Sequence, residues 1–323
     1  MRSYTVIGVG AIGGYYGARL QQAGHPVRFL ARSDAEHLRT HGLRVDSPEG
    51  DAVLDVDVYD DPGRVPVSDT LIVATKTTAN DEIASVVERL AGGDGDRPTT
   101  VLVMQNGLGV ERTFAARAPE ATVVGAMCFM CCNKIGPGHI RHLDYGAVTA
   151  GQHTDDGSAA GVTPAVEAVL EDLHGAGVAA TPVASLPTGR WQKLVWNMPF
   201  NGLSVVHNAA TDQLVADPAI RARAVHIMSE VIEAAGACGY PLDRGLIDRQ
   251  LANTESMTPY RPSMKLDYDG GRVLELDAIY EVPTRTARNA GAPMVDTEDL
   301  LAELRQLDPG QVGSGRVTPP AAP

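Results

Sequence analysis

The stretch VIGVGAIGGYYGARL, Val6 to Leu20, begins almost at the first residue of the chain. A short apolar run leads into glycines at positions 8, 10 and 13, and a helix-like segment follows. In such a strand, turn and helix, the first glycine permits the tight turn, the second lets backbone approach a pyrophosphate, and the third lets helix pack on strand. The helix N-terminus attracts phosphates. The predicted dinucleotide-binding residues are Gly8, Val9, Gly10, Ala11, Ile12 and Gly13.

The N-terminal half of the chain continues to alternate short β-rich runs with helical stretches, which is typical of βαβ units around a parallel sheet. After about Leu186, apolar positions recur at helical spacing with little strand signal. We therefore expect an α/β fold, with an N-terminal Rossmann-type doubly wound parallel sheet and a C-terminal all-helical domain. The expected bounds are 1–186 for the nucleotide-binding domain, 187–308 for the helical substrate and catalytic domain, and 309–323 for a disordered tail.

Individual elements follow from the same patterns. Strands are expected at Tyr4–Gly8, Pro26–Leu30, Thr70–Thr75, Thr100–Met104 and Ala121–Met127. Helices are expected at Gly13–Ala23, Asp34–His41, Ala79–Leu90, Val110–Ala116 and Pro164–Gly175, and in the second domain at Thr188–His207, Pro218–Gly236 and Arg272–Asn289.

Composition narrows the class of partner. The 323 residues carry a net charge of −13, which argues against nucleic acid and against an acidic membrane surface. No segment has the roughly 18 uninterrupted apolar residues of a membrane span, and no basic-then-apolar leader precedes the first strand. Four cysteines do not suggest a secreted disulfide framework. We expect a cytoplasmic protein that acts on a small molecule.

The end of the second predicted strand, in VRFLARSD (27–34), bears on the choice of cofactor. An NAD site usually carries an acidic residue here, whereas a cation suits the 2′-phosphate of NADP. Arg32 lies just past the apolar run, and its guanidinium can hold that phosphate through two parallel hydrogen bonds. Arg32 therefore favours NADPH. If Asp34 faced the ribose instead, the preference would reverse.

Two further polar residues follow predicted strands. Lys76 comes after TLIVAT, and Asn106 comes after TVLVMQ, with Gly107 and Gly109 permitting a tight loop. Ligands in open parallel sheets gather at the carboxyl ends of the strands. Lys76 and Asn106 are therefore candidate cofactor-binding residues, although each alone could be a turn residue.

The second domain opens with RWQKLVWNMPFNGLSVV (190–206), in which Lys193, Asn197 and Asn201 are spaced four apart and share one helix face. Reduction of a ketone leaves negative charge on the oxygen, which requires a proton donor. A lysine can stabilise the oxyanion and give up a proton, and asparagines can orient the substrate without competing charge. The alternative is the solvated face of an amphipathic helix.

Together these pieces resemble the ketopantoate reductase family over nearly the whole chain, up to about residue 305. In the family's order they are GVGAIGG, FLAR, ATK, QNGLG, GRWQKLVWNMPFN, RPSMKLD and LELDAI. The resemblance implies NADPH-dependent reduction of 2-dehydropantoate, or of a closely related 2-keto acid, to the 2-hydroxy acid in pantothenate biosynthesis. A homodimer is considered as its assembly.

On the substrate side, the resemblance implies that Lys193 is the catalytic proton donor and also contacts substrate. Asn197 and Asn201 would bind substrate, and Ser263 would hold its carboxylate or hydroxyl groups. Ser263 also has a local explanation as the N-cap of a helix. Thr211, where the family can have an asparagine, and the added cation Arg261 leave room for a more acidic 2-keto acid.

On the cofactor side, the resemblance implies that Arg32 takes the 2′-phosphate and that Lys76 and Asn106 line the nicotinamide and substrate region. Cys131 would lie near the nicotinamide. Glu275, on the helix expected to begin near Arg272, would contact the cofactor, although it could equally be a surface helix residue. Two other functions stay open: a 3-hydroxyacid or opine-type dehydrogenase, and a non-catalytic NADP-binding sensor.

The segment CFMCCNKIGPGHIRH (128–142) has thiols and imidazoles at a spacing that suits zinc. Its flanks, however, predict a β-hairpin around GPG, in which side chains alternate between faces. Cys128 and Cys132 would then face one side and Cys131 the other, and His139 and His142 would be on opposite faces. We therefore expect buried free cysteines and no metal.

Overall fold

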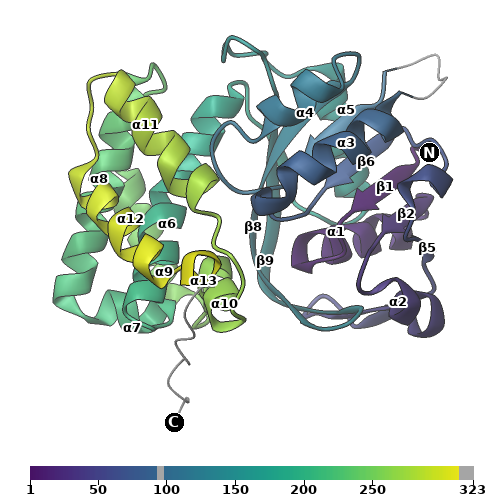
Figure 1. The fold of residues 1–323 in the computed structure, drawn as a ribbon, viewed down its shortest axis with the longest axis horizontal. Coiled ribbons are helices and arrows are strands. Elements are labelled where there is room, and N and C mark those ends of the chain that lie inside the picture. Colours follow the sequence, from purple (N-terminus) through teal and green to yellow (C-terminus); the bar gives the residue numbers. More distant parts are fainter. Residues whose placement is uncertain (93–97, 313–323) are drawn as a thin grey trace. The chain divides into compact units, whose positions relative to one another are not determined.

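The computed structural model describes residues 1–92 and 98–312 of the chain. The chain divides into two units, Met1–Gly189 and Arg190–Pro323, which are coloured purple to teal and green to yellow in Figure 1. The division falls close to the boundary predicted after Leu186 and lies inside the helix α6 (Leu186–Val206). The nucleotide-binding and substrate roles assigned to the two halves stay predictions.

The first unit is built on a mixed sheet whose centre is a doubly wound parallel sheet, as predicted. Strand β1 pairs with β2 on one side and with β6 on the other, and the parallel order runs β8-β7-β6-β1-β2-β5. The order reverses between β1 and β6, and open sheets of this kind bind ligands at such a point, beyond the carboxyl ends of the strands. The strands are β1 (Tyr4–Ile7), β2 (Val27–Leu30), β5 (Asp57–Tyr59), β6 (Thr70–Val73), β7 (Thr100–Val103) and β8 (Thr122–Gly136).

A long hairpin extends the sheet beyond β8. Strand β9 (His139–Gln152) runs antiparallel to β8, so the hairpin predicted around GPG is confirmed. The expected strand Ala121–Met127 was too short, because register shifts after Phe129 and Cys131 interrupt the two-residue alternation by which a strand is recognised. The remaining strands are β3 (Leu43–Asp46), β4 (Ala52–Leu54) and β10 (Ala180–Pro182).

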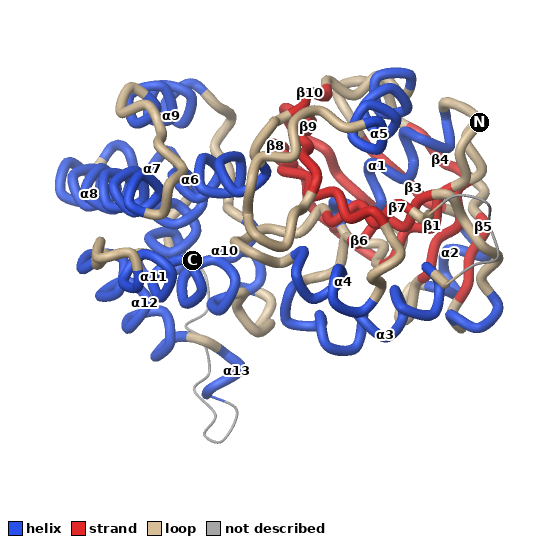
Figure 2. Tube along the Cα trace, turned by 90° about the horizontal axis from the view of Figure 1, so that it is seen from above, coloured by secondary structure: helices blue, strands red, loops and turns tan. Residues whose placement is uncertain are grey.

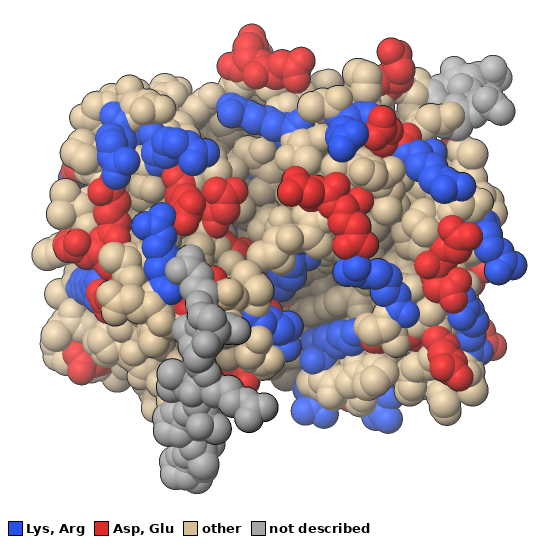
Figure 3. All heavy atoms as spheres, viewed as in Figure 1, with Lys and Arg blue, Asp and Glu red and all other residues tan. Residues whose placement is uncertain are grey.

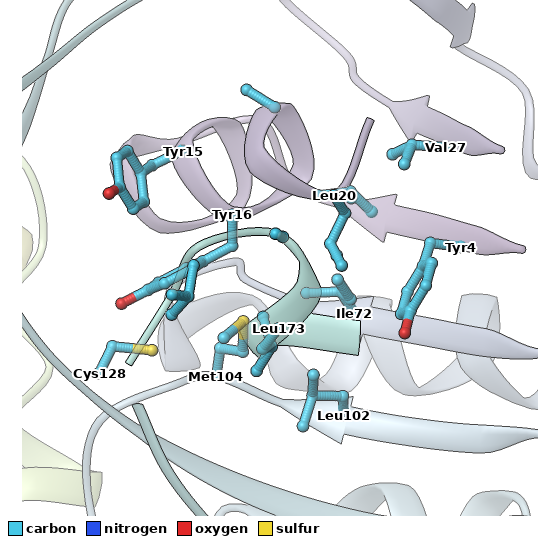
Figure 4. Close-up of a cluster of buried hydrophobic side chains, with 14 of the residues drawn as sticks. Tyr4, Tyr15, Tyr16, Leu20, Val27, Ile72, Leu102, Met104, Cys128 and Leu173 are labelled. Carbon is cyan, nitrogen blue, oxygen red and sulfur yellow. The ribbon is translucent and has the colours of Figure 1, made fainter. Parts of the chain in front are cut away.

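Helices cover both faces of this sheet (Figure 2), with α1 and α5 on one face and α3 and α4 on the other. Between α1 and the sheet, Leu20 points toward Ile72 and Tyr16 extends toward Cys128 (Figure 4), and all four are buried. The helical elements are α1 (Ala11–Gln22), α2 (Ala35–His41), α3 (Asn80–Ala91), α4 (Glu111–Arg117), α5 (Pro164–Gly175), η1 (Pro62–Arg64) and η2 (Thr77–Ala79).

The second unit is helical over its described residues, which confirms the predicted fold class. After α6 come α7 (Thr211–Ala216), α8 (Pro218–Ala237), α9 (Leu246–Ser256), α10 (Ser263–Asp269), the π-helical turn η3 (Asp277–Glu281), α11 (Val282–Asn289), α12 (Val295–Leu307) and α13 (Pro309–Val312).

Two expectations for this unit were wrong. The helix expected at Arg272–Asn289 starts late, because the turn at Gly271, with a φ of 63°, ends α10 and an irregular segment follows. The Asp308 carboxylate accepts the N–H of Leu274 at 3.0 Å and holds that segment in place. The same carboxylate accepts the N–H of Gly310, so the expected tail begins instead as α13; positions 313–323 lie outside the described residues.

Charged side chains of both signs are intermingled on the face drawn in Figure 3. Elsewhere and on this face alike, ion pairs join such groups; Arg39 pairs with Asp60 and Arg288 with Glu298 in the described chain. Among the helices that the structure describes, none is long and apolar enough to cross a membrane.

Candidate functional site

The glycine-rich turn has the geometry that each predicted role requires. Gly8 has a φ of 97°, which favours glycine, and a Cβ there would lie 2.7 Å from Cγ2 of Thr75. At Gly13 a Cβ would lie 2.1 Å from the carbonyl oxygen of Gly8, so only glycine lets α1 pack this closely. A Cβ on Gly10 would meet no atom of the described chain within 4 Å. Gly10 therefore faces open space, where a ligand can approach the backbone.

The N-terminus of α1 suits an anion. Its first helical hydrogen bond runs from the N–H of Gly14 to the carbonyl of Gly10 at 2.8 Å, so the N–H groups of Ala11, Ile12 and Gly13 precede the helical ladder. No described side chain caps this end, and no acidic residue lies in the first turn. These residues fit the pyrophosphate of a dinucleotide.

Arg32 follows β2 and is exposed, with its guanidinium hydrogen-bonded to both carboxylate oxygens of Glu82 at 2.8 and 2.9 Å. Asp34, the residue that could have reversed the cofactor preference, is buried and binds other residues of the chain. Its carboxylate pairs with Lys134 at 2.6 Å and accepts the N–H of Gly138 at 2.9 Å, at the end of the β8–β9 hairpin. Arg32 is thus the exposed group of the two, which favours a 2′-phosphate over a bare ribose.

Lys76 and Asn106 lie at the same edge of the sheet as the glycine-rich turn. Strands β6 and β7 are parallel neighbours, and β6 also pairs with β1, so their carboxyl ends come together. Lys76 is exposed at the start of η2, and Asn106 is half-buried after β7. The structure therefore brings these two side chains and the glycine-rich turn to one edge of the first unit.

Cys131 is on β8 and only 3% exposed. Burial, and then the nearby Asp144, raises the pKa of Cys131 to about 12, so the thiol stays protonated at neutral pH. Its neighbour Cys132 is the thiol in contact with the glycine-rich turn, with its Sγ 3.7 Å from the carbonyl oxygen of Ala11. Cys132 shares one buried cluster with Cys128, as the predicted alternation requires. The cofactor contact of Cys131 stays a prediction.

The histidines of the same hairpin bind other partners. His139 pairs with Asp46 at 2.8 Å, and His142 is buried with its ring nitrogens bonded to the Ser47 hydroxyl and to the carbonyls of residues 144 and 145. In the part of the chain that the structure describes, no three His, Cys, Asp or Glu residues are grouped so as to hold a metal ion.

The polar face of α6 is not a solvated face. Asn197 is 5% exposed and Asn201 is 2% exposed, while Lys193 is half-buried. The flanking Leu194 and Phe200 are fully buried. The structure therefore brings the predicted cation and the two amides onto one face of one helix, in surroundings that exclude most water.

Two local explanations for predicted site residues were wrong. Ser263 is not an N-cap: Pro262 takes that place, since its carbonyl accepts the N–H of Leu266 at 3.1 Å, and the hydroxyl makes no capping bond. Glu275 is neither on a helix nor at the surface. It is 4% exposed and lies before η3, where its carbonyl accepts the N–H of Ile279.

Thr211 and Arg261, the two residues that depart from the family pattern, form contacts within the second unit. Thr211 is buried, and its hydroxyl accepts the backbone N–H of Tyr260 at 3.2 Å. Arg261 is exposed and pairs with Asp269 at 3.1 Å. Thr211 is therefore engaged with the backbone, whereas Arg261, like Arg32, would exchange an exposed ion pair to bind a ligand.

Comparison with known families decides the class of protein. Residues 4–155 match the family described as ketopantoate reductase PanE/ApbA, and residues 186–308 match its C-terminal counterpart. The 2-dehydropantoate 2-reductase of Nostoc sp. is 42% identical over 318 residues, which cover 98% of both chains. This protein belongs to the ketopantoate reductase family. It is therefore an oxidoreductase, and the resemblance found in the sequence is confirmed.

Solved structures of ketopantoate reductases share the whole fold. The 2-dehydropantoate 2-reductase from Geobacter metallireducens superposes with a TM-score of 0.87 at 34% identity, covering 94% of this chain and 99% of that one. The enzyme from Methylococcus capsulatus gives 0.84 at 27% identity, covering 98% of each chain.

Three residues of this ketopantoate reductase family member lie beside predicted site residues without having been predicted. Glu82 binds Arg32, Cys132 contacts the glycine-rich turn, and Gln105 follows β7. The amide nitrogen of Gln105 donates to the carbonyl of Thr75 at 3.0 Å and to Oδ1 of Asn80 at 2.7 Å, which ties the ends of two strands together. A buried glutamine directly after an apolar strand is the signal that could have identified this residue.

Proposed function

We propose that this protein is a cytoplasmic 2-dehydropantoate 2-reductase, which uses NADPH to reduce the ketone of 2-dehydropantoate to the alcohol of pantoate in pantothenate biosynthesis. Curated relatives bear that name, one of them at 42% identity over nearly the full length. The homodimer considered from the sequence stays a prediction, which a measurement of molecular mass in solution would test.

Residues of the first unit would hold the cofactor, which when bound supplies a hydride to the carbonyl carbon of the substrate. The N–H groups at the start of α1 would bind the pyrophosphate, and the open side of Gly10 would let it approach. Arg32 would exchange its bond to Glu82 for the 2′-phosphate. Lys76 and Asn106, at the ends of neighbouring strands, would line the nicotinamide end.

Lys193 would complete the reduction. As the carbonyl carbon becomes tetrahedral, its oxygen gains negative charge, which the ammonium group would first stabilise and then protonate from Nζ. The amine would recover its proton from solvent. Asn197 and Asn201, on the same face of α6, would hold the ketoacid by hydrogen bonds that add no charge. Removing water from this face strengthens each of these interactions.

The Ser263 hydroxyl and the ion pair of Arg261 bear on which 2-keto acid is reduced. The Ser263 hydroxyl makes no helix cap, so a role with the substrate carboxylate or hydroxyl groups fits it. Arg261 is exposed and paired with Asp269, an ion pair that a more acidic 2-keto acid would have to replace. The choice of 2-dehydropantoate over such an acid rests on the curated relatives that bear its name.

The observation that carries the proposal is the alignment of Lys193, Asn197 and Asn201 on one face of α6 with both amides buried. A panel of 2-keto acids, followed by loss of NADPH absorbance, tests it. We expect 2-dehydropantoate to have the highest kcat/KM. Activity confined to 3-hydroxyacids or amino acid partners would identify a dehydrogenase of the opine type, and cofactor binding without turnover would identify a sensor.

A further inference from the structure

The helix that carries the predicted substrate amides is interrupted between them. Pro199 lies within α6, halfway between Asn197 and Asn201. Proline has no N–H, so the carbonyl of Val195 lacks its α-helical donor at this point. The hydrogen-bond ladder of α6 therefore lacks one bond beside the two amides.

Tyr280 contacts the backbone of α6 directly beside this proline. Its side chain is completely buried, and its hydroxyl donates to the carbonyl of Met198 at 2.7 Å. Burial raises the pKa of Tyr280 well above its ordinary value, while a hydrogen bond from the backbone N–H of Gly202 to the hydroxyl acts in the opposite direction. A Cβ on Gly202 would lie 2.7 Å from the hydroxyl oxygen, so glycine is what allows this approach.

The two backbone groups that meet this hydroxyl are α-helical partners. In an α-helix the N–H of Gly202 faces the carbonyl of Met198, four residues earlier. The hydroxyl of Tyr280 donates to that carbonyl and lies against Gly202, so it contacts both ends of one turn. The turn from Met198 to Gly202 includes Asn201, while Asn197 lies just before it.

The local backbone structure positions the Tyr280 side chain for its contact with α6. Tyr280 lies in η3, a π-helical turn of the kind that recurs at functional sites. The hydroxyl of Thr284 donates to the carbonyl of Tyr280 at 2.8 Å and fixes the end of this turn. Glu275 accepts the first helical bond of the same segment, so the residue predicted to contact cofactor and the hydroxyl in α6 share one short stretch of chain.

We infer that Tyr280 is a positioning residue of the reductase, whose hydroxyl holds the Met198–Gly202 turn of α6 and thereby aims Asn201 relative to Asn197 at the 2-keto acid. This inference rests on the proposed function. Without the hydroxyl, the carbonyl of Met198 loses this bond, and the turn that carries Asn201 shifts.

Kinetics of Tyr280→Phe test the inference. Loss of the hydroxyl raises KM for 2-dehydropantoate about tenfold, because displaced binding groups weaken substrate capture, and leaves Kd for NADPH within about twofold. Tyr4→Phe is the matched control. It also removes a buried hydroxyl, bonded to Asp172 at 2.6 Å, but lies at the amino end of β1. We expect it to lower Tm comparably without changing KM.

Pro199→Ala separates Tyr280 from the competing explanation. If Pro199 alone sets the geometry of the Met198–Gly202 turn, Pro199→Ala raises KM for 2-dehydropantoate and Tyr280→Phe does not. This result overturns the inference. Crystal structures of wild type and Tyr280→Phe decide the geometry without any turnover. A turn from Met198 to Gly202 that is displaced in the variant supports the inference, and an unchanged turn refutes it.

The proposed function can fail separately. Wild-type protein that does not reduce 2-dehydropantoate disproves the proposed function. The variant crystal structure then still decides whether Tyr280 fixes the Met198–Gly202 turn of α6. Wild-type protein that turns over normally, with equal KM values for wild type and Tyr280→Phe, leaves the function standing and disproves the positioning role.

Discussion

Replacing Arg32 by alanine removes the cation that distinguishes NADPH from NADH. In the structure the guanidinium is 70% exposed and bound to Glu82 at 2.8 Å. A hydrogen bond to a charged group contributes about 1.5–3 kcal/mol, and exposure places this one toward the lower end. The ion pair that is given up on binding is worth about 0.2–1 kcal/mol.

The net effect is therefore about 0.5–1.8 kcal/mol, or about a 2- to 20-fold rise in KM for NADPH. KM for NADH should not change, since it has no 2′-phosphate. Glu82→Gln removes the competing carboxylate and should lower KM for NADPH by about 1.4- to 5-fold, the equivalent of the exposed ion pair.

Steady-state assays with both nucleotides measure these ratios. Asp34→Asn is the matched control, because that carboxylate is buried against Lys134 and Gly138 and should leave the NADPH to NADH preference unchanged. Equal rises in KM for both nucleotides in Arg32→Ala, or a changed preference in Asp34→Asn, would refute the assignment of the 2′-phosphate to Arg32.

Two further predictions concern stability. Gly13→Ala places a Cβ 2.1 Å from the Gly8 carbonyl oxygen and should destabilise the protein by about 1–3 kcal/mol in urea unfolding. Gly10→Ala meets no described atom within 4 Å, so it should weaken NADPH binding without changing the urea midpoint; a lower midpoint would contradict this. Burial raises the pKa of Asp34, but the hydrogen bond and charge of Lys134 together with the N–H of Gly138 outweigh burial and hold the pKa below its ordinary value. The resulting stability is present at neutral pH and lost as the pH falls below about 4, so Lys134→Met should destabilise at pH 7 but not in acid, and a pH-independent difference would contradict the pairing.

Features set by neighbouring residues could be predicted from the sequence. The helix Pro164–Gly175 was predicted with its observed bounds because Pro164 suits the first turn and the Thr163 hydroxyl caps it, accepting the N–H of Val166. The turn at Gly8 follows in the same way, since its backbone conformation favours glycine. Three side chains four residues apart in α6 share a face wherever a helix forms.

Features set by distant residues could not be predicted. The sequence favours Arg32 but leaves Asp34 open as the alternative at the ribose, and only contacts with Glu82 and Lys134, far along the chain, show that Arg32 is exposed and Asp34 buried. Tyr280 looks like an ordinary buried aromatic residue, because nothing in its neighbourhood shows that its hydroxyl reaches α6. Such contacts depend on the packing of whole elements, for which local sequence carries no signal.

The central claim is that Lys193 protonates a ketone reduced with NADPH. The direct measurement compares NADPH oxidation with 2-dehydropantoate in wild type, Lys193→Met and the control Lys134→Met. Loss of the proton donor should reduce kcat by about 10²- to 10⁴-fold. We predict this loss in Lys193→Met alone, with the Kd for NADPH retained; near-normal turnover in that variant would contradict the account.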